Sequence, residues 1–122
     1  MKKIVILGGG TGGTIMANKL RKTLSKEEWE ITVVDKDKTH YYQPGFLFIP
    51  FGIYGKDDVI KPKANFIPSG VKLVFQEIDK IEPSDNKVVL GDGQILNYDY
   101  LIVATGTNID IDETPGLNDK LW

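Results

Sequence analysis

The hydrophobic pattern begins with a short unbroken apolar run, Ile4 to Leu7. Such a run is typical of a strand buried on both faces, as the strands of a parallel sheet are. From Thr14 onward the apolar positions repeat with the period of a helix, and charged side chains are expected largely on the opposite face. The apolar face holds Gly13, Met16, Ala17, Leu20 and Leu24, and the polar face holds Lys19, Arg21 and Lys22. The chain is therefore predicted to begin with a strand, a turn and a helix.

A second strand follows the helix. Polar residues 25–28 end the helical pattern, and Trp29 to Asp35 (WEITVVD) is rich in β-branched residues. The β-α-β unit closes within about 35 residues, the size expected for two parallel strands joined by a helix. Because such crossovers are right-handed, the turn after the first strand and the end of the second should meet at the carboxyl edge of the sheet.

The rest of the chain predicts a small antiparallel insertion. Residues 36–58 are irregular and rich in aromatic residues, and part of Gly45 to Phe51 is expected to form a short helix. Lys61-Pro62-Lys63 is interpreted as a short exposed loop. Further strands are predicted at Val71 to Glu77, Lys80 to Glu82, Lys87 to Leu90, Gln94 to Asn97 and Tyr98 to Ala104, with a hairpin turn at Gly91 to Gly93. The predicted fold is α/β: a Rossmann-like half-domain, in which a parallel sheet has a flanking helix and an inserted small antiparallel β-meander.

Five glycines and a threonine fill positions 8–13, between the first strand and the helix. Gly8, Gly10 and Gly13 match the G-x-G-x-x-G pattern of dinucleotide-binding folds. Gly8 permits the tight turn, Gly10 lets the backbone approach a pyrophosphate, and Gly13 lets the helix pack closely on the sheet. The amino end of the helix then directs free N–H groups and partial positive charge at the phosphates.

An acidic residue completes this fingerprint. Asp35 lies 22 residues after Gly13, close to the roughly 20 expected for the acid that accepts hydrogen bonds from a ribose diol. Its carboxylate disfavours a 2′-phosphate, so NADP is not the expected ligand. A glycine-rich turn without a ligand is the alternative, and the fingerprint alone does not separate FAD from NAD.

The composition excludes several classes of function. At 122 residues the chain is one domain's worth of protein, and its net charge of −2 gives no general attraction to nucleic acid. The absence of cysteine and the single histidine, His40, leave no disulfide framework and no spacing for a metal site. No apolar stretch is long enough for a transmembrane helix or a signal peptide, so a cytoplasmic protein is predicted. Any chemistry must come from a bound cofactor or from elsewhere.

Two further segments carry a family resemblance. YDYLIVATGTN, residues 98–108, resembles the second flavin-binding signature of flavoproteins with two dinucleotide domains, which ends in Ala-Thr-Gly. THYYQPGFLFIPFGIYG, residues 39–55, is similar to the corresponding region of sulfide:quinone oxidoreductases and, less closely, of type II NADH dehydrogenases. The two signatures together indicate FAD as the cofactor.

The resemblance implies the cofactor-binding residues, and it implies no catalytic residue within this chain. The glycine-rich residues would hold the pyrophosphate, Asp35 the adenosine ribose and Lys36 the rim beside the adenine. Ile78 would offer backbone groups to the adenine, and three consecutive residues of the middle segment would lie toward the isoalloxazine ring. The complete set is Gly8, Gly10, Thr11, Gly12, Gly13, Asp35, Lys36, Tyr42, Gln43, Pro44, Ile78, Ala104, Thr105 and Gly106.

The resemblance also implies a larger enzyme. Complete members run to several hundred residues, with a second nucleotide-binding domain, a later Gly-Asp flavin motif and redox cysteines. The chain is therefore expected to be the amino-terminal part of such an enzyme, inert alone, whose parent transfers electrons from sulfide to a quinone through FAD. The alternatives are part of a type II NADH:quinone oxidoreductase, or a stand-alone dinucleotide-binding module.

The aromatic and aliphatic residues from Tyr41 to Tyr54 leave two interpretations open. They could form a quinone path or a surface that faces the inner side of the cell membrane, or they could pack against the core or the missing C-terminal domains. Uncovered, such an apolar patch favours self-association, so a homodimer or aggregation is expected. His40 is interpreted as a structural hydrogen-bonding residue and not as a base.

Overall fold

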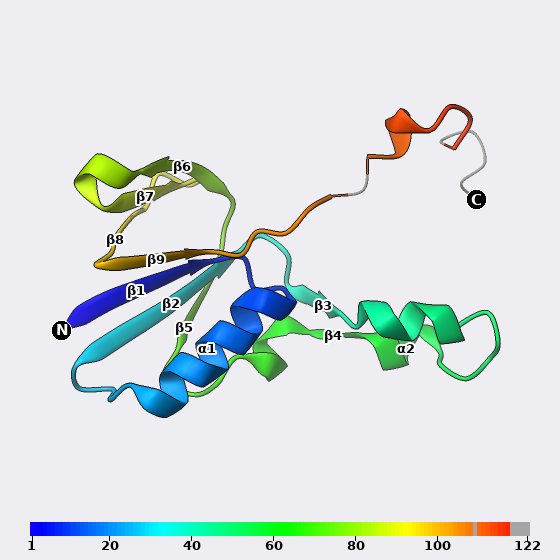
Figure 1. Cartoon of the computed structure of the whole chain (residues 1–122), viewed down its shortest axis with the longest axis horizontal. Helices are drawn as coiled ribbons and strands as arrows, with labels where there is room; N and C mark the ends of the chain where they lie inside the picture. Colours follow the sequence, from blue (N-terminus) through cyan, green and yellow to red (C-terminus); the bar gives the residue numbers. More distant parts are fainter. Residues whose placement is uncertain (109, 118–122) are drawn as a thin grey trace.

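A four-stranded parallel sheet forms the centre of the computed structural model, which describes residues 1–108 and 110–117 (Figure 1). Its strand order is β5-β2-β1-β9. The strands are β1 (Lys2–Leu7), β2 (Trp29–Asp35), β5 (Lys72–Phe75) and β9 (Tyr100–Val103). Helix α1 (Thr11–Thr23) joins β1 to the parallel strand β2. The predicted Rossmann-like β-α-β unit is confirmed.

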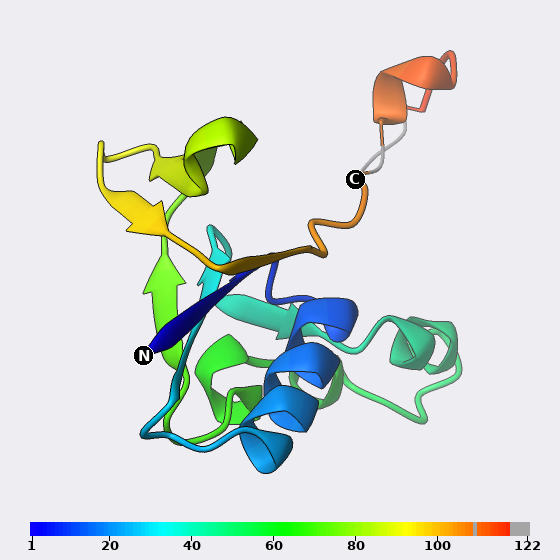
Figure 2. The ribbon, with the colours of Figure 1, turned by 60° about the vertical axis from the view of Figure 1, so that its left-hand side comes forward.

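The two faces of the sheet are covered by different elements, as Figures 1 and 2 show. On one face Ile4 and Ile6 pack with Ala17 of α1. On the other face Val5 and Leu7 pack against the antiparallel meander of β6 (Ile78–Glu82), β7 (Lys87–Leu90) and β8 (Ile95–Asn97). Burial on both faces explains why β1 is an unbroken apolar run. The carboxyl edge of the strands remains open for a ligand.

A separate two-stranded sheet lies at the base of an arm, residues 39–62, that extends away from the four-stranded sheet (Figure 1). Strand β3 (Thr39–Tyr41) pairs antiparallel with β4 (Ile60–Pro62). The remaining short elements are η1 (Gln43–Phe48), α2 (Lys56–Val59), η2 (Lys63–Phe66), η3 (Pro83–Asp85) and η4 (Ile111–Glu113). The expected short helix is thus a 3-10 helix, while the pairing of β3 with β4 was not predicted because each strand has only three residues.

Some element boundaries differ from those predicted. Helix α1 begins at Thr11 and not at Thr14, so two glycines lie in its first turn. The strand expected at Val71 to Glu77 is the shorter β5, and it joins the parallel sheet beside β2. Strand β6 begins at Ile78, two residues before the predicted Lys80, with a register irregularity between these residues.

Arg21 lies on the buried side of α1, so its predicted place on the exposed face is wrong. Its guanidinium donates through Nη1 to the Trp29 and Gly70 carbonyls at 3.1 and 3.2 Å, and through Nη2 to the Leu24 carbonyl at 2.6 Å. The planar fork with five donors can satisfy several carbonyls at once, and this offsets the cost of burying its charge. A prediction from residue type alone therefore places the Arg21 side chain on the wrong face of the helix.

The charge cluster on the meander leads to a testable titration. Hydrogen bonds from Lys80 and Lys87 lower the pKa of Glu82 to about 2. An NMR pH titration of the Glu82 side-chain carbon should therefore show a midpoint near pH 2 at low salt, and the Lys80→Met and Lys87→Met variants should each raise it. A wild-type midpoint near the ordinary glutamate value of about 4.3 would contradict the ion pairs.

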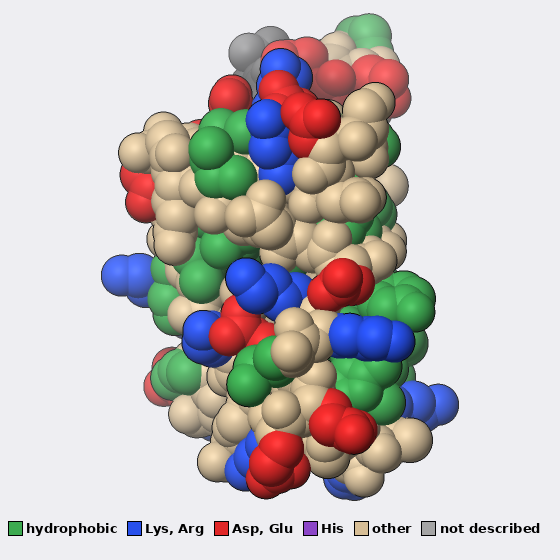
Figure 3. Space-filling model, turned by 90° about the vertical axis from the view of Figure 1, so that its left-hand side faces the viewer, with side chains coloured by type: hydrophobic (Ala, Val, Ile, Leu, Met, Phe, Trp, Pro, Cys, Tyr) green, Lys and Arg blue, Asp and Glu red, His purple; other side chains and the backbone are tan. Residues whose placement is uncertain are grey.

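One face of the molecule carries side chains of both charges. On the face shown in Figure 3, which carries the amino terminus, lysine and arginine side chains lie among aspartate and glutamate without a large field of one sign. Within the described residues, no helix is long and apolar enough to span a bilayer.

Candidate functional site

Two adjoining cavities, of about 570 and 470 Å³, open at the carboxyl edge of the parallel sheet. The first extends from Val34 toward the meander, and the second extends past the head of α1 toward the arm. Their shared lining comes from the ends of β1, β2 and β9: Gly8, Asp35, Lys36, Thr105, Gly106, Thr107 and Asn108. The edge where dinucleotides bind in such folds is therefore hollowed on this chain.

The glycine-rich turn and the Ala-Thr-Gly segment meet at this edge. Gly8 has a φ of +95°, a conformation that favours glycine, and its amide donates to the Val34 carbonyl at 2.8 Å. A Cβ on Gly8 would overlap the carbonyl oxygen of Ala104. The Ala104 amide in turn donates to the Leu7 carbonyl at 2.7 Å. The two signatures, far apart in sequence, are therefore in direct contact.

The head of α1 is built to leave backbone N–H groups available. Gly10 is the N-cap residue and provides no side-chain cap, and no acidic residue lies in the first turn. Nothing lies within 4 Å of the place a Gly10 Cβ would take, so a ligand can approach the backbone closely there. A Cβ on Gly13, by contrast, would overlap the Gly8 carbonyl oxygen. Gly13 thus provides the predicted close packing. Gly10 leaves open space beside the backbone, while its contact with a pyrophosphate stays a prediction.

Asp35 is fixed at the end of β2 by three donors. Its Oδ2 accepts from the Gly9 amide and from Lys63 Nζ, each at 2.6 Å, and its Oδ1 accepts from the Asp37 amide at 2.8 Å. Burial raises the pKa of Asp35, but these hydrogen bonds and the positive charge of Lys63 together hold it below the ordinary value. Asp35 is therefore an oriented carboxylate at neutral pH, in contact with the glycine-rich turn.

Lys63 was not recognised as a site residue, and its predicted place in an exposed loop is wrong. Its side chain is only 4% exposed, and Lys61 and Pro62 before it belong to β4. Its amide donates to the Lys38 carbonyl at 2.8 Å, which fixes the backbone beside the arm. Pairing of β3 with β4 turns Lys63 inward under the glycine-rich turn.

The structure gathers most of the predicted site residues around the two cavities. Gly13, Tyr42 and Pro44 line neither of them. The predicted residues that line at least one are Gly8, Gly10, Thr11, Gly12, Asp35, Lys36, Gln43, Ile78, Ala104, Thr105 and Gly106. These placements agree with a ligand that runs along the carboxyl edge, while the contact of each residue with a cofactor stays a prediction.

Several lining residues were missed by sequence reasoning. Tyr41, the last residue of β3, lines the second cavity, and its neighbour Tyr42 does not. His40 also lines it, and its ring contacts that of Phe66 in a tilted arrangement with a centroid distance of 4.4 Å. Its Nδ1 is buried without a hydrogen-bond partner among the described residues, so the hydrogen bond expected of His40 is not formed at this atom. The other missed residues are Leu7, Val34, Asp37, Thr39, Lys63, Gln76, Glu77, Ile81, Val103, Thr107 and Asn108.

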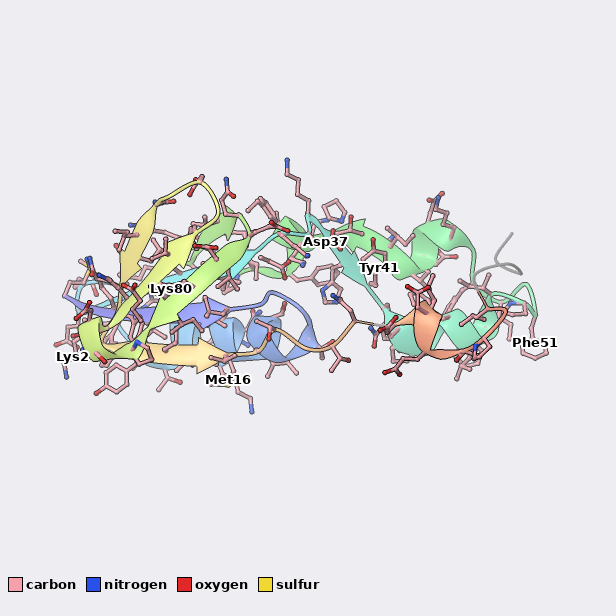
Figure 4. All side chains as sticks on the ribbon, turned by 90° about the horizontal axis from the view of Figure 1, so that it is seen from above. Lys2, Met16, Asp37, Tyr41, Phe51 and Lys80 are labelled. Carbon is pink, nitrogen blue, oxygen red and sulfur yellow. The ribbon has the colours of Figure 1, made fainter. Side chains whose placement is uncertain are left out.

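The apolar side chains of the arm are largely uncovered. Leu47 is 74% exposed and Phe51 is 78% exposed, and Figure 4 shows Phe51 at the tip, far from Tyr41 at the base. Within the described chain these two side chains therefore do not pack against the core. Val59, which is buried beside Gly45, is an exception.

Comparisons with known proteins identify the family. A family model described as pyridine nucleotide-disulphide oxidoreductase matches residues 2–122. The mitochondrial sulfide:quinone oxidoreductase of Dictyostelium discoideum is 37% identical over 119 residues, which are 98% of this chain and 26% of that protein. The type II NADH:quinone oxidoreductase of Staphylococcus haemolyticus is 36% identical over 118 residues, which are 96% of this chain and 28% of that protein.

A solved structure agrees with these matches. The sulfide:quinone oxidoreductase of Aquifex aeolicus has a TM-score of 0.77 at 26% identity, with 90% of this chain and 25% of that one covered. This chain thus spans about a quarter of the length of the relatives it matches. The family consists of FAD-dependent oxidoreductases, so the predicted cofactor and enzyme class are confirmed at the level of the family. With residues 2–122 matched, the chain belongs to the pyridine nucleotide-disulphide oxidoreductase family.

Proposed function

We propose that this chain forms the amino-terminal, FAD-binding part of an oxidoreductase that transfers electrons from sulfide to a quinone. One observation carries the FAD assignment: the glycine-rich turn at Gly8 touches the Ala104-Thr105 segment, and both line the cavities at the carboxyl edge. The G-x-G-x-x-G fingerprint alone would fit either FAD or NAD. Its contact with the Ala-Thr-Gly signature favours a flavoprotein.

The residues present fit an FAD molecule. The uncapped head of α1 at Gly10 and Thr11 would hold the pyrophosphate, and Asp35 would accept hydrogen bonds from the adenosine ribose. The cavity lined by Ile78 would receive the adenine, and the cavity lined by Gln43 would receive the flavin side. When bound, FAD supplies two-electron redox chemistry, and this chain positions it and limits its contact with water.

The electron donor is supported by the named relatives. The matched protein of D. discoideum is a sulfide:quinone oxidoreductase, and the solved structure from A. aeolicus is another. A type II NADH:quinone oxidoreductase matches with nearly the same identity, which keeps NADH as the second candidate donor. Both classes name a quinone as the acceptor. This chain has no cysteine, so thiol chemistry on sulfide would need cysteines beyond these residues.

FAD retention tests the proposal directly. Purified protein mixed with FAD and then desalted should keep a flavin absorbance band, whereas the same treatment with NAD should leave little bound nucleotide. The Gly10→Ala variant tests where the FAD binds, because its new methyl group would occupy the open approach to the head of α1. It should fold and retain about tenfold less FAD, the loss expected from one displaced close contact. Retention of NAD alone would overturn the FAD assignment.

The electron donor is identified with the protein that the complete reading frame encodes. Under anaerobic conditions, sulfide should bleach its flavin absorbance and NADH should not. Bleaching by NADH alone would establish the second candidate. A reading frame that ends at Trp122 would instead favour a stand-alone dinucleotide-binding module.

The exposed apolar arm supports the remaining parts of the proposal. Leu47 and Phe51 would be covered by further domains of the enzyme, by a second copy in a homodimer, or by lipid at the inner face of the cell membrane. Quinones are apolar, so a peripheral site on the membrane suits a quinone-dependent enzyme. The arm is the part of the described chain that best fits such a contact.

A further inference from the structure

Lys63 is a buried cation that the family fingerprint does not account for. Its Nζ and the Gly9 amide both lie 2.6 Å from the same oxygen of Asp35, so the ammonium is a close neighbour of the glycine-rich turn. Its Cδ would lie 3.0 Å from a Cβ on Gly9, which shows that the lysine stem runs directly under this turn. Lys63 also lines the cavity that contains the head of α1.

The charges around that cavity explain why a cation is needed there. Asp35 and Asp37 contribute two carboxylates, and Lys36 and Lys63 contribute two ammonium groups. Lys36 is mostly exposed and lies 3.5 Å from Glu77, so its charge is largely screened by water and by its partner. Without Lys63, the carboxylates would dominate and would repel a ligand that carries phosphate groups.

We propose that Lys63 is a specificity-determining residue: it balances the charge of Asp35, so that one cavity accepts both the ribose and the pyrophosphate of an adenosine diphosphate moiety. This inference rests on the proposed function. Asp35 provides the acceptor that ribose needs, but its negative charge opposes the neighbouring phosphates. Lys63, held on the carboxylate and buried away from solvent, removes this opposition without displacing Asp35.

The distinction from a purely structural role lies in which ligands are affected. If Lys63 only supported the fold, its replacement would lower the affinities for adenosine and for ADP by the same factor. If Lys63 balances charge, its replacement would lower the affinity for ADP selectively, because adenosine carries no phosphate. The ratio of ADP affinity to adenosine affinity therefore isolates the electrostatic role of Lys63.

Isothermal titration calorimetry of this chain with ADP and with adenosine measures the ratio in four proteins. These are the wild type, Lys63→Met, Asp35→Asn and the double variant. Lys63→Met should lower the ratio about tenfold, as expected for unit charges several ångströms apart near a protein surface. Asp35→Asn should raise the ratio, and the double variant should return to within about threefold of the wild type.

Lys61→Met is the matched control, because Lys61 is an exposed lysine two residues earlier that lines neither cavity. It should leave the ratio unchanged within about twofold. If Lys63→Met does not fold, the step from Asp35→Asn to the double variant still removes Lys63, and the ratio should fall about tenfold. Circular dichroism confirms the folded state of each variant.

The outcomes separate the two proposals. Wild-type binding of ADP with an equal ratio in all folded variants would overturn the role of Lys63 and leave the nucleotide site standing. Failure of the wild type to bind ADP or FAD would overturn the proposed function and this inference together. A ratio that follows the net charge of residues 35 and 63 would establish the role of Lys63.

Discussion

Gly13→Ala is expected to destabilise the chain by about 4 kcal/mol or more, or to prevent it from folding. The new Cβ would overlap the Gly8 carbonyl oxygen, and it would lie 3.4 Å from Ile6 Cγ2. Backbone must move to relieve this overlap, since no flexible side chain is available to give way. Chemical denaturation followed by circular dichroism should show a large fall in the denaturation midpoint.

Gly10→Ala provides the control for this effect, because it adds the same methyl group three residues earlier where nothing lies within 4 Å. Its free energy of unfolding should fall by no more than about 1 kcal/mol, the cost of alanine at an N-cap. Equal stability losses in the two variants would show that α1 does not pack on the turn as described.

Asp35→Asn is expected to lower the free energy of unfolding at neutral pH by about 3 to 5 kcal/mol. The change leaves the Lys63 ammonium buried without its counter-charge, and the neutral amide has a single oxygen to serve the Gly9 and Asp37 amides. Urea denaturation at pH 7 measures the loss. The double variant with Lys63→Met should recover much of it, since removing both charges leaves no unpaired ion.

The effect of Asp35 should depend on pH in a defined direction. Its pKa is lower in the folded chain than in the unfolded chain, where it is about 3.9. The stabilisation is therefore fully present above about pH 4 and is lost as the pH falls through the lower folded value. The stability difference between the wild type and Asp35→Asn should shrink in acid. A difference that stays constant down to pH 2 would contradict the lowered pKa.

This structural role changes how binding experiments on Asp35 must be interpreted. Loss of nucleotide after replacement of Asp35 would reflect both a missing ribose acceptor and a destabilised turn. The double variant with Lys63→Met separates these effects, because it restores neutrality while the ribose acceptor stays absent.

The fold was predictable where local pattern decides it. The apolar run of β1, the periodicity of α1 and the turn at Gly91 to Gly93 each have a short-range cause, and the structure contains all three elements. The base of the arm was not predictable in this way, because the ladder between β3 and β4 pairs residues that lie about 20 positions apart in the sequence. The parallel placement of β5 likewise depends on its neighbour β2.

The site was predictable where backbone geometry demands a residue type. Gly8 and Gly13 are required by close contacts, and Asp35 by its position at the end of β2. Arg21 and Lys63 were misplaced because charged residues are usually exposed, and only tertiary partners can reverse that expectation. For Lys63 the partner is 28 residues away in sequence, and a proline beside it favours a loop.

The end position of β9 in the sheet has a consequence for the chain on its own. Beyond β9 no further strand is paired among residues 1–108 and 110–117, so one row of its amide and carbonyl groups has no strand partner there. Tyr100 and Val103 are exposed along it, and the strand contains neither lysine nor proline to discourage pairing. Intermolecular β-augmentation there would join two copies edge to edge, by a route that does not involve the apolar arm.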